Sequence, residues 1–217
     1  YNYLRWSTTM NSQIKSIEMF DLFSIGLGIY QRVENISEEE FNSVKEEIYT
    51  NNELNEIGTN FKLFHSCKEL NKIKNFCQES LDHYFNEILN KKEKLEISIS
   101  WANKTNPGMA HHTHNHRNSV ISGVFYFNDT SESPITFTNP WRVFDAYETN
   151  IKNNHNKYNM ETSTIQSKAE NYCILFPSFL PHNVEQNISN NTRYSIAFNS
   201  FFKPNQEIGS GATLLKL

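Results

Sequence analysis

The chain has 217 residues, of which 37 % are hydrophobic, 13 % are aromatic and 20 % are charged, and its formal net charge at pH 7 is −4. This composition excludes a disordered chain and fits one large domain with an aromatic core. The charge gives no general attraction to nucleic acid or anionic lipid, no apolar run is long enough to span a bilayer, and the three cysteines form no CxxC pair. We therefore expect a cytoplasmic protein with neither a membrane nor a nucleic acid as partner.

Two capping-box patterns predict helices in the first half of the chain. The first box pairs Ser37 with Glu40, and the second pairs Ser66 with Glu69. Apolar positions follow each box at helical spacing, namely Phe41, Val44 and Ile48 after the first, and Leu70, Ile73, Cys77, Leu81, Tyr84 and Ile88 after the second. We expect the apolar face of the second, longer helix to pack on a sheet.

From Lys94 the hydrophobic period changes from that of a helix to that of a strand. Leu95, Ile97, Ile99 and Trp101 alternate with polar neighbours, which predicts a half-buried strand with these four side chains on one face. Further β-rich runs cover Val120–Phe127, Ile135–Thr138, Tyr172–Phe176 and Tyr194–Phe202. Helices followed by strands predict an α+β, mainly β fold, with packing helices before an antiparallel sandwich or jelly roll.

We predict a single domain over residues 18–203, with its core at 94–202, a flexible N-terminal extension at 1–17 and a C-terminal tail at 204–217. Residues 141–167 are polar, rich in Asn and without a clear period. A loop of this length is either a lid over a binding site or a disordered surface insertion. In a lid, substrate contacts would come from Trp141, Arg142, Phe144 and Tyr147. No pattern predicts a particular oligomeric state.

Four of the eight histidines fall together, at positions 111, 112, 114 and 116, just before a predicted strand. Residues two apart in a strand share a face, so His114 can present a pair of imidazoles to one ion with either His112 or His116. A third ligand is expected from His182, which stands beside a strand and a Pro-bounded turn. The competing interpretation is a solvated, histidine-rich loop without a resident metal.

Arg193 stands eleven residues after His182, at the start of the predicted strand that begins at Tyr194. A guanidinium buried beside a metal site is stabilised when it binds a carboxylate through two parallel hydrogen bonds. A diacid ligand would meet this need. The competing interpretation is a surface arginine paired with a nearby glutamate.

At this point the sequence resembles the 2-oxoglutarate/iron(II) oxygenases of phages and marine bacteria, in the double-stranded β-helix (jelly-roll, cupin-like) superfamily. The resemblance runs from about Phe20 to Phe202. The blocks that carry it are Trp101-Ala102-Asn103 with Gly108, His114 to Ser119, Ile121 to Phe127, Phe176-Pro177-Ser178 with His182, and Arg193 to Asn199.

The resemblance implies that His114, His116 and His182 bind Fe(II), and that Arg193 and Ser195, with a hydroxyl from Tyr126, hold the far carboxylate of 2-oxoglutarate. Most of the superfamily has Asp or Glu where this chain has His116, so His112 stays open as the second ligand. The implied reaction consumes O2 and 2-oxoglutarate, releases succinate and CO2, and hydroxylates an unidentified substrate. Two rivals are a three-histidine dioxygenase without cosubstrate, in which Arg193 binds the substrate, and a non-enzymatic jelly-roll binding module.

Overall fold

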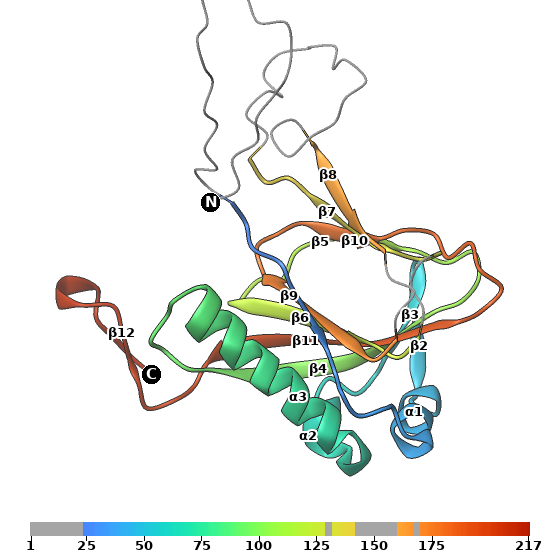
Figure 1. The fold of residues 1–217 in the computed structure, drawn as a ribbon, viewed down its shortest axis with the longest axis horizontal. Coiled ribbons are helices and arrows are strands. Elements are labelled where there is room, and N and C mark those ends of the chain that lie inside the picture. Colours follow the sequence, from blue (N-terminus) through green and yellow to red (C-terminus); the bar gives the residue numbers. More distant parts are fainter. Residues whose placement is uncertain (1–23, 129–131, 142–159, 167–169) are drawn as a thin grey trace, which may run out of the picture.

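Two antiparallel sheets dominate the computed structural model, which describes residues 24–128, 132–141, 160–166 and 170–217 (Figure 1). The larger sheet has the strand order β1-β9-β6-β11-β4-β3-β2, and the smaller has the order β5-β10-β7-β8. The larger sheet comprises β1 (Gly28–Gln31), β2 (Tyr49–Asn52), β3 (Asn55–Gly58), β4 (Leu95–Thr105), β6 (Ile121–Tyr126), β9 (Tyr172–Pro177) and β11 (Arg193–Phe202). The smaller comprises β5 (His111–His114), β7 (Ile135–Thr138), β8 (Thr162–Ile165) and β10 (His182–Val184). These bounds confirm a mainly β fold.

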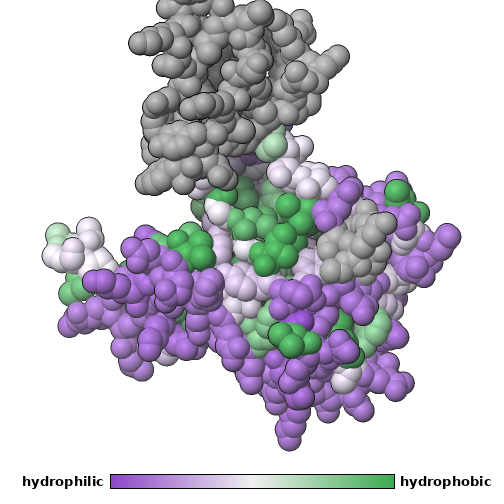
Figure 2. All heavy atoms as spheres, in the orientation of Figure 1, coloured by the Kyte–Doolittle hydropathy of each residue, from purple (hydrophilic) through white to green (hydrophobic). Residues whose placement is uncertain are grey.

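Helices cover one face of the larger sheet (Figure 1). They are α1 (Glu38–Lys45), α2 (Leu63–Ser66), the 3-10 turn η1 (Lys68–Leu70), α3 (Asn71–Asp82) and the π-helical turn η2 (His83–Ile88). Hydrophilic residues cover the outer side of the helices, while hydrophobic residues gather between the two sheets on the face drawn in Figure 2. None of the helices in the described part of the chain is long and apolar enough to cross a membrane.

The larger sheet separates two hydrophobic clusters, because alternate residues of its strands point to opposite faces. Phe125 packs with the helices, whereas the next residue, Tyr126, packs on the side of the smaller sheet. Gly123 permits close packing on the helical side, since a Cβ there would lie 2.2 Å from Cζ of Phe198. The sheet thus presents one face to the helices and keeps the other for the space between the sheets.

The first capping box is confirmed and the second is wrong. The Glu40 backbone N–H donates to Ser37 Oγ at 3.2 Å, and the Ser37 N–H donates to the Glu40 carboxylate at 2.8 Å. Ser66 instead ends α2, and its hydroxyl donates to the Lys62 carbonyl at 3.1 Å. Helix α3 therefore begins only at Asn71. The predicted apolar stripes also run too far, because Ile48 is 72 % exposed and Ile88 is 58 % exposed.

The predicted strand at Leu95 is confirmed, but its side chains do not share one face. Opposite β11, Ile99 pairs with Asn199 and Ile97 pairs with Ser200, so Ser98 is an extra residue in β4. This bulge shifts the alternation. Leu95 and Ile97 pack with the helices, whereas Trp101 faces the space between the sheets.

The expected loop at 141–167 contains a strand. Thr162–Ile165 form β8, which pairs with β7 and brings Thr136 Oγ1 within 2.9 Å of Thr164 Oγ1. Trp141 is 57 % exposed, while Arg142, Phe144 and Tyr147 lie outside the described residues, as does the extension at 1–17. The predicted tail at 204–217 forms a small hairpin of β12 (Glu207–Ile208) and β13 (Leu215–Lys216), with the 3-10 turn η3 (Gly211–Thr213) between them.

Candidate metal and cosubstrate site

A small cavity lies between the two sheets. Polar side chains reach it from the larger sheet, namely those of Asn55, Asn103, Tyr126, Arg193 and Ser195. The smaller sheet contributes His111, His114 and His182, and His116 lies two residues past the end of β5. Apolar walls come from Val124, Ile135, Val184 and Ala197. No Asp or Glu of the described chain lines this cavity.

Strand pairing brings three of the predicted histidines together. His114 of β5 lies opposite His182 of β10, and their ring centroids are 4.4 Å apart. His116 joins them from the following turn, with ring centroids 5.0 Å from His114 and 5.1 Å from His182. One potential ligand atom of each lies within 4.8 Å of the other two, which suits a single metal ion.

Backbone carbonyls orient two of these imidazoles. Nδ1 of His114 lies 2.9 Å from the carbonyl oxygen of His112, and Nδ1 of His182 lies 2.9 Å from that of Leu180. A neutral imidazole that donates from Nδ1 keeps the lone pair of Nε2 for a metal. His116 is held through its backbone, whose N–H donates to the carbonyl of Ser178 at 3.0 Å.

Burial keeps these imidazoles in the form that binds metals. It lowers the pKa of His182 to about 3 and that of His116 to about 4, and it lowers the pKa of His114 as well. All three side chains are therefore neutral at neutral pH, when a histidine ligand does not first have to lose a proton.

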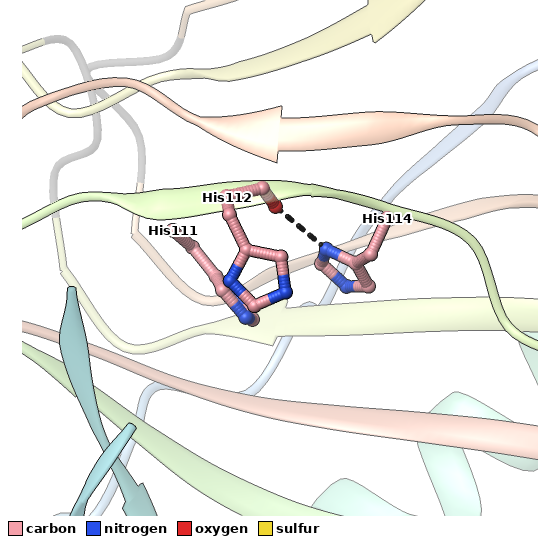
Figure 3. Close-up of side chains that lie close together, drawn as sticks. All are labelled: His111, His112 and His114. Carbon is pink, nitrogen blue, oxygen red and sulfur yellow. Dashed lines mark hydrogen bonds between the residues drawn. The ribbon is translucent and has the colours of Figure 1, made fainter. Parts of the chain in front are cut away.

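His112, the alternative second ligand, does not share this arrangement. Its side chain is exposed, and it forms a separate group with His111 and His114 (Figure 3). The pairing of His114 with His116 was expected from two-residue spacing along a strand. In the structure His116 lies past the end of β5, so the pair results from the turn that follows.

Arg193 is buried on the opposite wall, at the start of β11. It is 4 % exposed, which excludes the surface-arginine interpretation, and it forms no ion pair with any residue that the structure describes. Its Cζ lies 4.9 Å from the ring centroid of Tyr126. Both Arg193 Nε and the Tyr126 hydroxyl are buried without a hydrogen-bond partner.

A carboxylate ligand would satisfy both groups. Burial raises the pKa of Tyr126, so its hydroxyl stays protonated and can donate a hydrogen bond to a carboxylate. A buried guanidinium without a counter-ion is costly, and a carboxylate matches its geometry. Ser195, two residues along β11, is buried and lines the same cavity. The predicted clamp residues thus fit the far end of a diacid such as 2-oxoglutarate.

Sequence reasoning assigned no role to several polar residues in the cavity or next to it. Asn103 Oδ1 and Thr105 Oγ1 are also buried without a hydrogen-bond partner. Both lie at two-residue steps after Trp101 in β4, so they share its face. Once the face of Trp101 was known, this spacing could have predicted that both side chains point toward the space between the sheets. Asn55 reaches the cavity from β3, for which no strand was predicted, so no signal identified it.

Comparison with known proteins is consistent with this site. A family model described as "Putative 2OG-Fe(II) oxygenase" matches residues 99–199. No curated protein sequence matches the chain.

Solved structures share the fold at low sequence identity. The α-ketoglutarate-dependent epimerase SnoN from nogalamycin biosynthesis has a TM-score of 0.58 at 8 % identity, over 81 % of this chain and 78 % of that one. A prolyl hydroxylase from Trichoplax adhaerens has a TM-score of 0.56 at 12 % identity, over 82 % and 84 %. HygX from Streptomyces hygroscopicus, solved with nickel, 2-oxoglutarate and hygromycin B, has a TM-score of 0.55 at 9 % identity, over 81 % and 82 %.

These structures confirm the predicted double-stranded β-helix. The family model matches the part of the chain that carries the three histidines and Arg193, and the histidine triad could hold a metal ion.

Proposed function

We propose that the chain is an Fe(II)- and 2-oxoglutarate-dependent dioxygenase that hydroxylates its substrate, with His114, His116 and His182 as the iron ligands. Arg193, Tyr126 and Ser195 bind the far carboxylate of 2-oxoglutarate. The observation that carries this proposal is the cavity itself. It has three neutral imidazoles that converge on one wall and, on the other, a buried guanidinium that forms no ion pair with the described residues, and no carboxylate of the described chain lines it.

The residues of the chain have separate tasks in this reaction. When bound, iron with 2-oxoglutarate and O2 supplies an oxidation that releases succinate and CO2 and inserts one oxygen atom into a C–H bond. His114 and His182 would hold the metal through Nε2 while their Nδ1–H groups donate to the backbone carbonyls of His112 and Leu180, and His116 would be the third ligand. Arg193 and Tyr126 fix the orientation of the diacid through its far end, and Val124 and Ile135 help to keep water away.

The test is succinate release by the purified protein with Fe(II), 2-oxoglutarate and O2, with each component omitted in turn. We expect slow succinate formation that needs all three, and faster formation with a true substrate. His182→Ala should abolish it, and Arg117→Ala, at an exposed position, should not. Oxygen consumption that does not depend on 2-oxoglutarate would favour the three-histidine dioxygenase instead. No oxygen consumption with any mixture would favour the binding module.

A further inference from the structure

A second group of three histidines lies beside the proposed iron site. His111, His112 and His114 also bring one potential ligand atom each within 4.8 Å of the others. Their ring centroids are 4.9 Å apart for His111 and His112, 4.4 Å for His111 and His114, and 5.5 Å for His112 and His114. The three rings face one another beneath the same strand (Figure 3). We call this group the outer triad, and His114, His116 and His182 the inner triad.

An irregular register in β5 creates the outer triad. His114 lies opposite His182 and His111 lies opposite Val184, so three steps along β5 match two steps along β10. In a regular strand, residues three apart point to opposite faces. The bulge at 112–113 cancels that alternation, and both His111 and His114 line the cavity. His112 remains exposed to solvent beside them.

The two triads share His114. Its Nδ1 is engaged with the carbonyl of His112 at 2.9 Å, which leaves only the lone pair of Nε2 for a metal. One lone pair binds one ion, so the two triads cannot both be complete at the same time. The other contact in the outer triad is weak, because Nδ2 of Asn52 lies 3.4 Å from Nε2 of His111 and an ion can displace it.

We propose that the outer triad is a second binding site for a divalent ion such as Zn²⁺, Ni²⁺ or Co²⁺, and that it competes with the inner triad for His114. Three imidazole donors without a carboxylate suit ions of this class, and water can fill the remaining positions beside the exposed His112. Binding at the outer triad stands on its own geometry. The competition rests on the proposed function, since it requires metal at the inner triad.

Titration with Co²⁺, followed by calorimetry, separates the two sites. The wild-type chain should bind one Co²⁺, because His114 is shared. His182→Ala disables the inner triad and should still bind one Co²⁺. The double variant His182→Ala/His112→Ala should bind at least about tenfold more weakly than His182→Ala, since loss of a ligand costs no less than the 10- to 100-fold known for second-shell partners. His65→Ala, in an exposed part of α2, is the matched control and should bind as wild type does.

Three other results would contradict the outer site, the sharing of His114 or the inner site. If His182→Ala and His116→Ala both fold, as shown by wild-type thermal melting, and neither binds Co²⁺, the outer site does not exist. Two Co²⁺ per wild-type chain would overturn the sharing of His114. If His182→Ala binds with wild-type affinity and His112→Ala alone abolishes binding, the outer triad stands and the proposed inner iron site fails.

Discussion

Replacing Arg193 with Met removes the only cationic side chain that lines the described cavity and keeps an unbranched apolar side chain in place of the methylene part of Arg193. Arg193 is 4 % exposed, so a carboxylate bound to it is largely screened from water. Removing one partner of a buried, hydrogen-bonded charge pair costs about 2–5 kcal/mol. At about 1.4 kcal/mol for each factor of ten, the dissociation constant of 2-oxoglutarate should rise by roughly thirtyfold to several thousandfold.

The same substitution should not destabilise the ligand-free protein. Arg193 forms no ion pair among the described residues and its Nε has no hydrogen-bond partner there, so Met removes a buried charge that no carboxylate of the described residues compensates. The free energy of unfolding in urea should therefore stay the same or increase. A loss of binding without a loss of stability would separate a ligand-binding role from a structural one.

The assay is an anaerobic titration of the iron-loaded protein with 2-oxoglutarate, followed by the visible absorption band of the chelate. Arg193→Lys should recover only part of the affinity, because an ammonium cannot form two parallel hydrogen bonds to a carboxylate. Arg117→Met is the control, since it makes the same change at an exposed position. If the Arg193→Met variant bound 2-oxoglutarate with wild-type affinity, the proposed role of Arg193 in binding its far carboxylate would be refuted. A normal 2-oxoglutarate titration with loss of substrate affinity alone would favour the cosubstrate-free dioxygenase.

Three further predictions concern the histidines. In a His112→Ala background, where the outer triad is disabled, His182→Ala should abolish stoichiometric Fe(II) binding, measured by equilibrium dialysis; retained iron would exclude His182 as a ligand. His116→Asp should keep Fe(II) bound, because carboxylates suit this ion, whereas His116→Ala should weaken it; if both matched wild type, His116 would not be a ligand. Burial lowers the pKa of His182 and His111 to about 3 and that of His116 to about 4, whereas the unfolded value is about 6.5. The unfolded chain then binds more protons below pH 6.5, so the unfolding free energy of the metal-free protein should fall from pH 6.5 to 4, by up to about 1.4 kcal/mol per pH unit for each histidine. In urea melts, the unfolding free energy of His182→Gln should fall less between pH 6.5 and 4 than that of wild type. An equal fall would argue against the lowered pKa of His182 as a cause.

The strands that carry the site were predictable because their residues have strong local signals. The run Ile135–Thr138 has the bounds of β7, and the run from Tyr172 differs from β9 by one residue. Histidine density and the position of Arg193 after His182 predicted which side chains meet in the cavity. The cytoplasmic location and the phage or marine-bacterial source that the resemblance implies stay predictions.

The features that escaped prediction depend on pairing between distant segments. The extra residue at Ser98 shows only in the register of β4 against β11, and the bulge at 112–113 shows only against β10. Neither strand contains a Gly or Pro at these positions that would mark the irregularity. Strand β8, with the sequence Thr-Ser-Thr-Ile, is an edge strand with three exposed residues, so it lacks the hydrophobic alternation by which strands are identified.

Because no carboxylate is among the described residues that line the cavity, binding of the metal and binding of the cosubstrate should each strengthen the other. In the proposed site, Fe(II) contributes two positive charges, Arg193 contributes one, and the three imidazoles contribute none. The dianion of 2-oxoglutarate then supplies all the negative charge, whereas a carboxylate at the position of His116 would supply one unit of it permanently. Metal and diacid therefore attract each other more strongly in this cavity than in a site with a carboxylate ligand, and by linkage each must raise the affinity of the other by the same factor. The proposed site should therefore hold iron more tightly when 2-oxoglutarate is bound, and the proposed outer triad would give competing ions an alternative use of His114 when the diacid is absent.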